Sequence, residues 1–245
     1  MKEVKIAGLM QVKDYDNECH AFDTLKELGD YTIILDNNST TSFPFTGKCD
    51  EYISLKHSQL WNCGANKILL MYRAFVAGYE WVIHWDDDII PNAELNRAAV
   101  SDAVLYLQDK NVDMGLVKRY DLWENWRQYR IDGVFCNKFF PLIQRNIFCR
   151  TDLNFKEPSK IRLHSRQPLK DKNLENQLIT SFVVYHTGMK TRQKREARWN
   201  MYQREDKNLE FQNNYDYILE ENGVKLQTVP FDDWETIYNK TKQLV

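Results

Sequence analysis

The sequence lacks long hydrophobic runs. No stretch of about 18 apolar residues occurs in the 245-residue chain, and the charged start, Met1 to Lys5, has no apolar run behind it. A membrane-spanning helix and a secretory leader each need such a run. We therefore expect neither a signal peptide nor a membrane span, and a cytoplasmic protein.

Paired cysteines are also missing. The chain has five cysteines with no Cys-x-x-Cys pair among them: Cys19, Cys49, Cys63, Cys136 and Cys149. This scatter argues against a disulfide scaffold and against a structural zinc site. We expect free thiols.

What is present is the composition of an ordinary globular protein, with 43% hydrophobic, 13% aromatic and 28% charged residues. One α/β domain over residues 1–245 is the simplest organisation at this length. The net charge of −2 conceals an asymmetry, because the segment 138–204 holds 15 Lys or Arg against 5 Asp or Glu. A positive segment of this kind indicates an anionic partner or substrate.

Short apolar runs alternate with helical patterns in the first half. Strands are expected at 4–10, 31–35, 51–55 and 81–85, and helices at 19–28, 62–78 and 100–107. In the second helix we expect a buried face made of Ile68, Met71, Tyr72, Phe75 and Val76. The alternation predicts an α/β fold whose mainly parallel sheet is flanked by helices on both faces.

The second half is less periodic. Residues 114–117 and 180–185 are predicted strands, and 155–172, with two prolines and many charges, is a predicted surface loop.

Three carboxylates follow the predicted strand 81–85. Asp86, Asp87 and Asp88 would lie at the carboxyl ends of the strands, where open α/β sheets bind ligands. Neighbouring anions repel unless a cation compensates them, and oxygen ligands favour Mg²⁺ or Mn²⁺. We predict a metal site that holds a diphosphate, against the alternative of a solvated acidic turn.

The strand 31–35 also ends in an acid, Asp36. This carboxylate is suited to accept a hydrogen bond from a nucleobase or a ribose hydroxyl. An Asx-type turn is the alternative.

Together these segments resemble family 2 glycosyltransferases, which have the glycosyltransferase-A fold, a Rossmann-like α/β architecture. The likeness covers roughly residues 4–110. Its motifs are Tyr15-x-Asn17-Glu18, Asp36 with Ser39 and Thr40, the helix Gly64-Ala65-Asn66-Lys67, and Trp85-Asp86-Asp87-Asp88 with Pro91. Asn37 and Thr41 depart from the family pattern, because acids are frequent at both places.

The resemblance implies a role for each matched residue. Asp36 would hold the base, Asp86 would meet the ribose or the metal, and Asp88 would ligate the metal. Asn66, Lys67 and Asp87 would complete the donor site. It also implies a division of labour, with 1–112 as the nucleotide-sugar-binding half and 113–245 as the acceptor-binding half.

The predicted strand 180–185 leads into His186 and a basic segment. Neutral imidazole is a competent third ligand beside carboxylates, and in many glycosyltransferase-A enzymes a late histidine completes the metal site. A structural hydrogen-bonding histidine is the alternative. Lys190, Arg192 and Arg195 are candidates to clamp the donor diphosphate.

The acceptor and the general base stay open. The basic segment 138–204 is suited to nucleic acid, for example a hydroxymethylated base in DNA, and a glycan is the other main candidate. Asp132, Asp152 and Glu157 are candidate bases by location.

The leading hypothesis is a metal-dependent glycosyltransferase that uses a UDP- or GDP-sugar with Mn²⁺ or Mg²⁺. A sugar nucleotidyltransferase should carry a glycine-rich phosphate loop after the first strand. Residues 8–18, however, contain a single glycine, Gly8. A non-catalytic nucleic-acid binding module is the other alternative.

Overall fold

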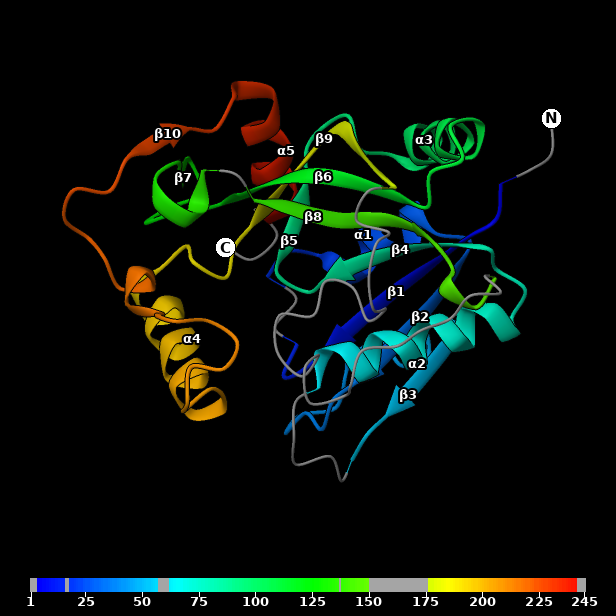
Figure 1. Cartoon of the computed structure of the whole chain (residues 1–245), viewed down its shortest axis with the longest axis horizontal. Helices are drawn as coiled ribbons and strands as arrows, with labels where there is room; N and C mark the ends of the chain where they lie inside the picture. The colour runs from blue at the N-terminus through cyan, green and yellow to red at the C-terminus, as the bar shows by residue number, and fades with distance from the viewer. Residues whose placement is uncertain (1–3, 16–17, 57–61, 137, 150–175, 242–245) are drawn as a thin grey trace. The chain divides into compact units, whose positions relative to one another are not determined.

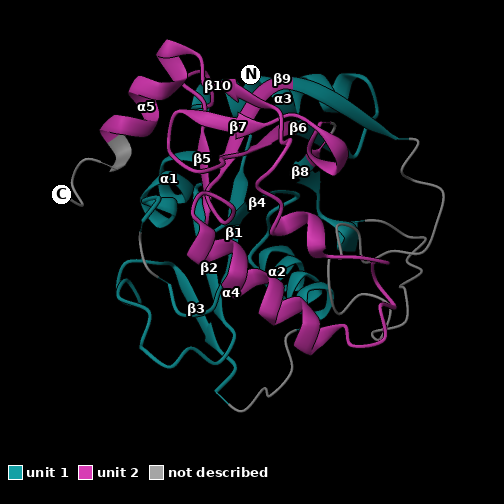
Figure 2. Cartoon of the chain, turned by 90° about the vertical axis from the view of Figure 1, so that its left-hand side faces the viewer, with its two compact units in different colours: residues 1–87, 96–117, 140–180 teal, residues 88–95, 118–139, 181–245 magenta. Residues whose placement is uncertain are grey.

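The computed structural model of the chain describes residues 4–15, 18–56, 62–136, 138–149 and 176–241. The loop predicted over 155–172, and the residues Asn17, Asp152 and Glu157, lie outside these ranges. The chain folds into two compact units (Figure 2). Unit 1 comprises Met1–Asp87, Asn96–Val117 and Phe140–Thr180, and unit 2 comprises Asp88–Leu95, Lys118–Phe139 and Ser181–Val245. These units do not coincide with the halves 1–112 and 113–245, whose donor and acceptor roles stay predictions.

Unit 1 has the predicted alternation of strands and helices (Figure 1). Its elements are β1 (Ile6–Val12), α1 (Ala21–Leu28), β2 (Tyr31–Asp36), β3 (Glu51–Ser54), α2 (Cys63–Val76), β4 (Trp81–Asp86) and α3 (Arg97–Asp109). Three strands run from one unit into the other: β6 (Met114–Asp121), β8 (Phe139–Arg145) and β9 (Gln177–His186).

The first four strands form a parallel sheet in the order β3-β2-β1-β4, and the complete order is β3-β2-β1-β4-β8-β6-β9-β5. The order 3-2-1-4 is that of a Rossmann-like fold, in which the topological switch point lies between β1 and β4. Pairing turns antiparallel where β8 joins β4. The predicted α/β sheet flanked by helices is confirmed, and the sheet is mixed beyond β4.

Helices cover both faces of β1. On one face, Ala7, Leu9 and Ile33 pack against Leu70 and Met71 of α2. Gly8 points to the other face, where a methyl group would lie 2.6 Å from Cδ1 of Leu25 on α1. The absence of a side chain at this position therefore lets α1 approach the strand closely.

The predicted face of α2 was partly wrong, although Met71 is buried as predicted. Its buried residues include Lys67, Leu70, Met71 and Ala74, whereas Tyr72, Phe75 and Val76 are exposed. The apolar residues of α2 exceed what one face can hold, and Tyr72 and Phe75 contact the ring of Phe148 instead of the sheet. Asn62 caps the N-terminus of α2, because its Oδ1 atom accepts a hydrogen bond from the Ala65 amide at 2.9 Å.

Unit 2 is built around the ends of β6 and β9. It also contains β5 (Ile89–Pro91), β7 (Gln128–Arg130), α4 (Arg192–Glu205), β10 (Leu226–Thr228) and α5 (Phe231–Thr241). β5 pairs antiparallel with β9, with Ile89 opposite His186, and β10 pairs antiparallel with β7. A small aromatic core includes Trp123, Phe135, Tyr202 and Tyr215.

Candidate functional site

In unit 1 the polar residues gather where β1, β2 and β4 end. Gln11 stands opposite Asp86 in the register, and Val12 stands opposite Asp36. These ends flank the switch point between β1 and β4, which is where sheets of this topology bind ligands. α2 begins at the same edge, since Nε2 of Gln11 donates to Sγ of Cys63, the first residue of that helix, at 3.0 Å.

Asp86 is the carboxylate at the end of β4. Its side chain is half-buried, and among the described residues it forms no hydrogen bond or ion pair. The acceptor atom Oε1 of neighbouring Gln11 is buried and also has no partner in the described part of the chain. A buried polar atom without a partner costs free energy. Oε1 of Gln11 and the carboxylate of Asp86 can therefore both accept hydrogen bonds from a ligand at this edge.

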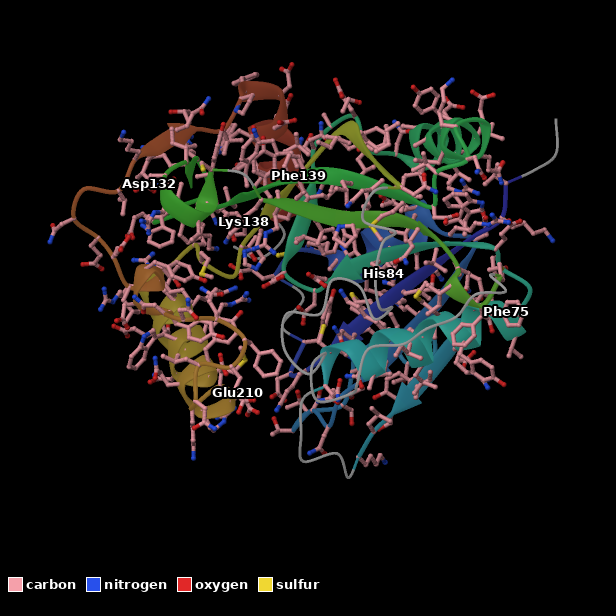
Figure 3. The ribbon with its side chains drawn as sticks, viewed as in Figure 1. Phe75, His84, Asp132, Lys138, Phe139 and Glu210 are labelled. Carbon is pink, nitrogen blue, oxygen red and sulfur yellow. The ribbon has the colours of Figure 1, made fainter. Side chains whose placement is uncertain are left out.

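Lys67 adds a positive charge near this edge. It lies in the second turn of α2 and is 9% exposed, and its ammonium group forms no ion pair or hydrogen bond with any described residue. Burial, helped by the charge of Lys67, lowers the pKa of His84 on β4 to about 3 (Figure 3). Lys67 therefore lies close to a strand that ends in an unpaired carboxylate.

Two of the other predicted donor residues, Asp36 and Asn66, form hydrogen bonds with neighbouring residues of unit 1. Asp36 accepts hydrogen bonds from the Ser39 amide at 2.9 Å and from the Tyr52 hydroxyl at 2.7 Å. Nδ2 of Asn66 donates to Oδ1 of Asn37 at 3.2 Å. The Asp36–Ser39 contact is the Asx-type turn that was the alternative for this segment, and the nucleotide-binding roles of Asp36, Asn66 and Asp87 stay predictions.

In unit 2, His186 lies between two carboxylates. Its Nε2 atom is 2.9 Å from Oδ2 of Asp88, and its Nδ1 atom is 2.5 Å from Oδ1 of Asp121. The strand order β6-β9-β5 explains this arrangement. His186 ends the central strand, Asp121 ends one neighbour, and Asp88 directly precedes the other.

Arg198 of α4 holds Asp88 from a second side. Its Nη2 atom donates to Oδ2 of Asp88 at 2.6 Å, and Nη1 lies 3.1 Å from Nε2 of His186. Burial acts to raise the pKa of Asp88, but the neighbouring His186 and Arg198 outweigh it and hold this pKa well below its usual value. Asp88 is therefore ionised in the folded chain.

Asp121 is completely buried and is balanced by cations. Nζ of Lys138 (Figure 3), next to β8, lies 3.1 Å from Oδ2 of Asp121, and Arg119 lies 3.3 Å from Oδ1. Although burial acts to raise the pKa of Asp121, these charges and the hydrogen bond with His186 hold it well below its usual range. Burial also lowers the pKa of Lys138 to about 8.

The His186 side chain fits a metal ligand in its orientation. An imidazole that donates its Nδ1 proton to a carboxylate presents a lone pair at Nε2, which is the arrangement common behind metal-binding histidines. Two adjacent ligands of an octahedral Mg²⁺ or Mn²⁺ lie roughly 3.0 Å apart, close to the 2.9 Å between Nε2 and Oδ2 of Asp88. Within the described ranges, no three His, Cys, Asp or Glu side chains converge as a metal-binding group.

Gly188 allows this cluster to pack. A methyl group at Gly188 would lie 2.5 Å from Oδ2 of Asp88 and closer still to Nη2 of Arg198. Thr187 adds two hydrogen bonds to the Asp88 carbonyl, from its amide at 2.7 Å and from its hydroxyl at 3.2 Å. The segment 186–188 therefore fixes both the backbone and the side chain of Asp88.

The basic residues predicted to clamp the diphosphate have partners within unit 2. Arg195 is buried and pairs with Glu124 at 2.6 Å, and Arg192 pairs with Glu196 at 2.7 Å. Lys190 lies 3.3 Å from the centroid of the Trp126 ring. Their role at the donor stays a prediction.

Asp132 is the only candidate base within the described ranges. It pairs with Arg130 at 2.5 Å (Figure 3), and this hydrogen bond is the main cause that lowers its pKa. A carboxylate with a lowered pKa is a weaker base. The assignment stays a prediction, as it does for Asp152 and Glu157.

Sequence reasoning missed Gln11, Asp121 and Arg198. Asp121 ends the observed strand β6, but the predicted strand stopped at residue 117, so no signal placed Asp121 at a strand end. Arg198 belongs to the basic segment 138–204, and only the packing of α4 brings it to Asp88.

No family model matches the sequence, and no curated protein matches it. Among solved structures, Rv0371c from Mycobacterium tuberculosis H37Rv has a TM-score of 0.39 at 8% identity and covers 74% of this chain and 90% of its own. A UDP-glucose pyrophosphorylase complexed with UDP-glucose has a TM-score of 0.38 at 9% identity, with 99% and 98% covered. Mannose-1-phosphate geranyltransferase from Thermus thermophilus has a TM-score of 0.34 at 8% identity, with 88% and 67% covered. These similarities are too weak to support a function, so any function has to be argued from the residues of this chain.

No helix in the described part of the chain has the length and apolar character needed to cross a membrane.

Proposed function

We propose that the chain is a metal-dependent glycosyltransferase that moves a sugar from a UDP- or GDP-sugar to an acceptor hydroxyl. The observation that carries the proposal is the environment of the Asp86-Asp87-Asp88 segment. Asp86 ends β4 at the switch point without a partner among the described residues, and Asp88 is held beside the ring of His186.

Asp88 and His186 are the proposed ligands of a Mn²⁺ or Mg²⁺ ion. The ion supplies Lewis-acid neutralisation of the departing diphosphate. Asp121 orients His186 through Nδ1, so that Nε2 stays available as a ligand. Arg198 contacts Oδ2 of Asp88 and Nε2 of His186 in this structure, so an ion held by these two atoms would have to displace the guanidinium group.

Unit 1 is the proposed nucleotide-binding part. The ammonium group of Lys67 and the first turn of α2 suit an anionic phosphate, because a helix N-terminus and a buried cation both favour negative charge. Oε1 of Gln11 and the carboxylate of Asp86 suit donors such as ribose hydroxyls or a base imide. Asp36 is the further candidate for the base.

Two alternatives fit less well. The turn after β1 has no glycine-rich phosphate loop of the kind expected in a sugar nucleotidyltransferase. A nucleic-acid binding module needs unpaired cations for phosphates, but Arg192, Arg195 and Arg198 of α4 pair with acids. Their charges are therefore already balanced within the protein, and the DNA acceptor gains no support from them.

Titration calorimetry with UDP, GDP and CMP, each with and without Mn²⁺, tests the proposal. We expect one nucleotide to bind only with Mn²⁺. Asp86→Asn should abolish that binding without changing the unfolding temperature, because Asp86 has no partner to lose in the described structure. Asp102→Asn, on the exposed face of α3 in the same unit, is the matched control and should bind normally.

Donor turnover then distinguishes the enzyme from a binding protein. The UDP- or GDP-sugar that matches the bound nucleotide should be hydrolysed slowly in the presence of Mn²⁺, with release of the nucleoside diphosphate. Release of pyrophosphate from a nucleoside triphosphate and a sugar phosphate would instead identify a nucleotidyltransferase. No binding of any nucleotide would overturn the proposal.

A further inference from the structure

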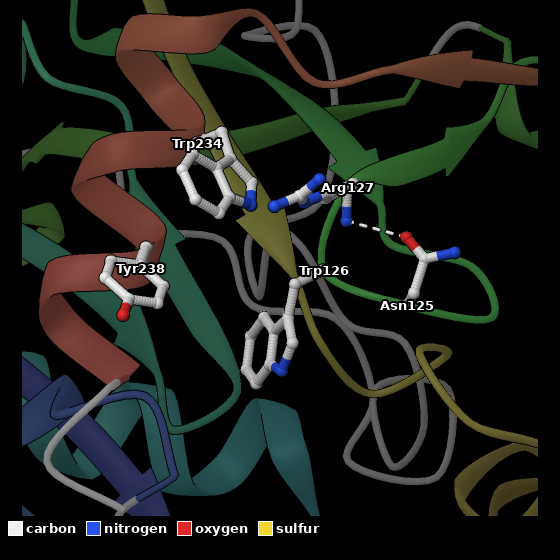
Figure 4. Close-up of a pocket in the computed structure, with 5 residues that line it drawn as sticks. All are labelled: Asn125, Trp126, Arg127, Trp234 and Tyr238. Carbon is white, nitrogen blue, oxygen red and sulfur yellow. Dashed lines mark hydrogen bonds between the residues drawn. The ribbon is translucent and has the colours of Figure 1, made fainter. Parts of the chain in front are cut away.

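A pocket in unit 2 is lined by none of the residues assigned above. It is lined by Asn125, Trp126 and Arg127, from the turn between β6 and β7, and by Trp234 and Tyr238 of α5 (Figure 4). Its volume is about 240 Å³. This is below the roughly 300–1,000 Å³ of pockets that hold drug-sized ligands, so the pocket suits one ring.

Aromatic rings dominate the walls of this pocket. The rings of Trp234 and Tyr238 are stacked, with centroids 5.2 Å apart and an angle of 23° between them. Trp126 comes from the turn between β6 and β7, and Nζ of Lys190 lies 3.3 Å from the centroid of its ring. Rings of this kind bind the flat, apolar face of a ligand while its polar edge stays in water.

Arg127 is the polar group available to a ligand. Its guanidinium lies 4.5 Å from the centroid of Trp234 and forms no ion pair or hydrogen bond with any described residue. The side chain of Asn125 is occupied, because Oδ1 accepts from the Arg127 amide at 2.7 Å and Nδ2 donates to Gln128 at 3.1 Å. The stacked, fork-shaped guanidinium is thus ready to bind an acidic group with two parallel hydrogen bonds.

The exposed ring faces limit the choice of ligand. In the view of Figure 4, Arg127 and Tyr238 lie on opposite sides of the Trp234 ring, and Lys190 covers part of Trp126. A nucleobase gains most from an uncovered ring face. A saturated sugar ring also stacks its apolar face on an aromatic ring, but it depends less on that contact, because the hydroxyl groups at its rim and an acidic substituent supply hydrogen bonds.

We propose that this pocket binds one sugar ring that carries an acidic group, and that this ring belongs to the acceptor. The acceptor role rests on the proposed glycosyltransferase function. The pocket connects to the metal-site segment through Lys190, which follows His186 by four residues and touches Trp126. A carboxylate and a phosphate on the ring share the chemistry that Arg127 recognises, so both sources belong to the proposal.

Saturation-transfer NMR on the full chain, without metal or nucleotide, tests the pocket independently of the donor site. The probes are methyl glucuronide, glucose 6-phosphate, methyl glucoside and AMP. We expect transfer to the glucuronide, the sugar phosphate or both, at least five-fold above transfer to the neutral glucoside. The better acidic probe identifies the carboxylate or the phosphate.

Variants assign the signal to the pocket. Trp234→Ala and Arg127→Gln should each reduce the signal at least five-fold, and Trp234→Phe should restore most of it if the alanine variant loses α5. Glu235→Ala is the matched control, because Glu235 is exposed on the same helix and does not line the pocket. Nucleotide binding measured by calorimetry should be unchanged in Arg127→Gln.

Three outcomes would overturn the inference. They are no transfer to any sugar, transfer to AMP alone, and equal signals from the glucuronide and the neutral glucoside. Because the NMR experiment contains no nucleotide or Mn²⁺, a failure here leaves the donor measurements standing, and a failure of nucleotide binding leaves the sugar result interpretable.

Discussion

Nδ1 of His186 lies 2.5 Å from Oδ1 of Asp121, and both side chains are buried, at 2% and 0% exposure. The contact makes Asp121 a positioning residue, because it fixes the ring plane and the proton of the histidine without reaching the proposed metal. The same carboxylate balances Lys138 and Arg119. It therefore links the stability of unit 2 to the chemistry at Asp88.

Asp121→Asn should separate these two effects. Loss of the buried negative charge leaves Lys138 and Arg119 without a counter-ion and should lower the free energy of unfolding by about 3 kcal/mol. Mn²⁺ affinity, measured by electron paramagnetic resonance on the folded variant, should fall about ten-fold, because His186 loses its orienting partner. An unchanged Mn²⁺ affinity would show that His186 is not a ligand, and Asp102→Asn is the control for both measurements.

Lys67→Met should weaken nucleotide binding and raise the free energy of unfolding. The change removes a buried ammonium group that has no described partner, so chemical denaturation should show a gain of about 1 kcal/mol. Nucleotide affinity should fall about ten-fold, because a charge-assisted contact to phosphate is lost. Lys5→Met, at an exposed position of the same unit, should change neither quantity. A variant that is stabilised but binds normally would remove Lys67 from the donor site.

His84 should make the protein sensitive to acid. Its pKa is about 3 in the folded chain, against an ordinary value of 6.5, so at mildly acidic pH the unfolded chain binds a proton that the folded chain does not. Stability is therefore complete above pH 6.5 and falls as the pH drops from 6.5 towards 3, by up to about 1.4 kcal/mol per unit. The free energy of unfolding, measured in urea across this pH range, should depend less steeply on pH in His84→Gln than in the unchanged protein. An equal dependence on pH in the two proteins would contradict the role given to His84.

Gly188→Ala should disturb Asp88 without replacing any charged residue. The added methyl group overlaps Asp88 and Arg198, and overpacking of this kind costs about 2 kcal/mol. Thermal unfolding should show the loss, accompanied by weaker Mn²⁺ binding. The control is Gly47→Ala, because a methyl group there meets no heavy atom within 4 Å and should be nearly neutral.

The first half of the fold could be predicted because each of its elements is marked by a short pattern of neighbouring residues. Each strand from β1 to β4 is a short apolar run, and Asn62 marks the start of α2 as its side chain caps the helix. The carboxyl ends of such strands are a known place for ligands, which is why Asp86 and Asp36 could be predicted as site residues.

The rest depends on pairing between distant segments. β5 has three residues and is defined by its partner β9, more than 90 residues away in the chain. No local pattern announces that Asp121 and Asp88 flank His186, because that follows from the strand order alone. The aromatic pocket likewise joins residues 125–127 to α5, which the sequence pattern did not separate from ordinary surface.

Cys63 offers a chemical handle on unit 1. Its half-buried thiol is the first residue of α2 and accepts a hydrogen bond from Gln11, whose Oε1 atom awaits a partner. A ligand that engages Gln11 must alter access to this sulfur. In a chain whose Cys49, Cys136 and Cys149 have been changed to serine, the rate at which a thiol-directed reagent labels Cys63 thus reports whether a ligand occupies that edge, before any product is known.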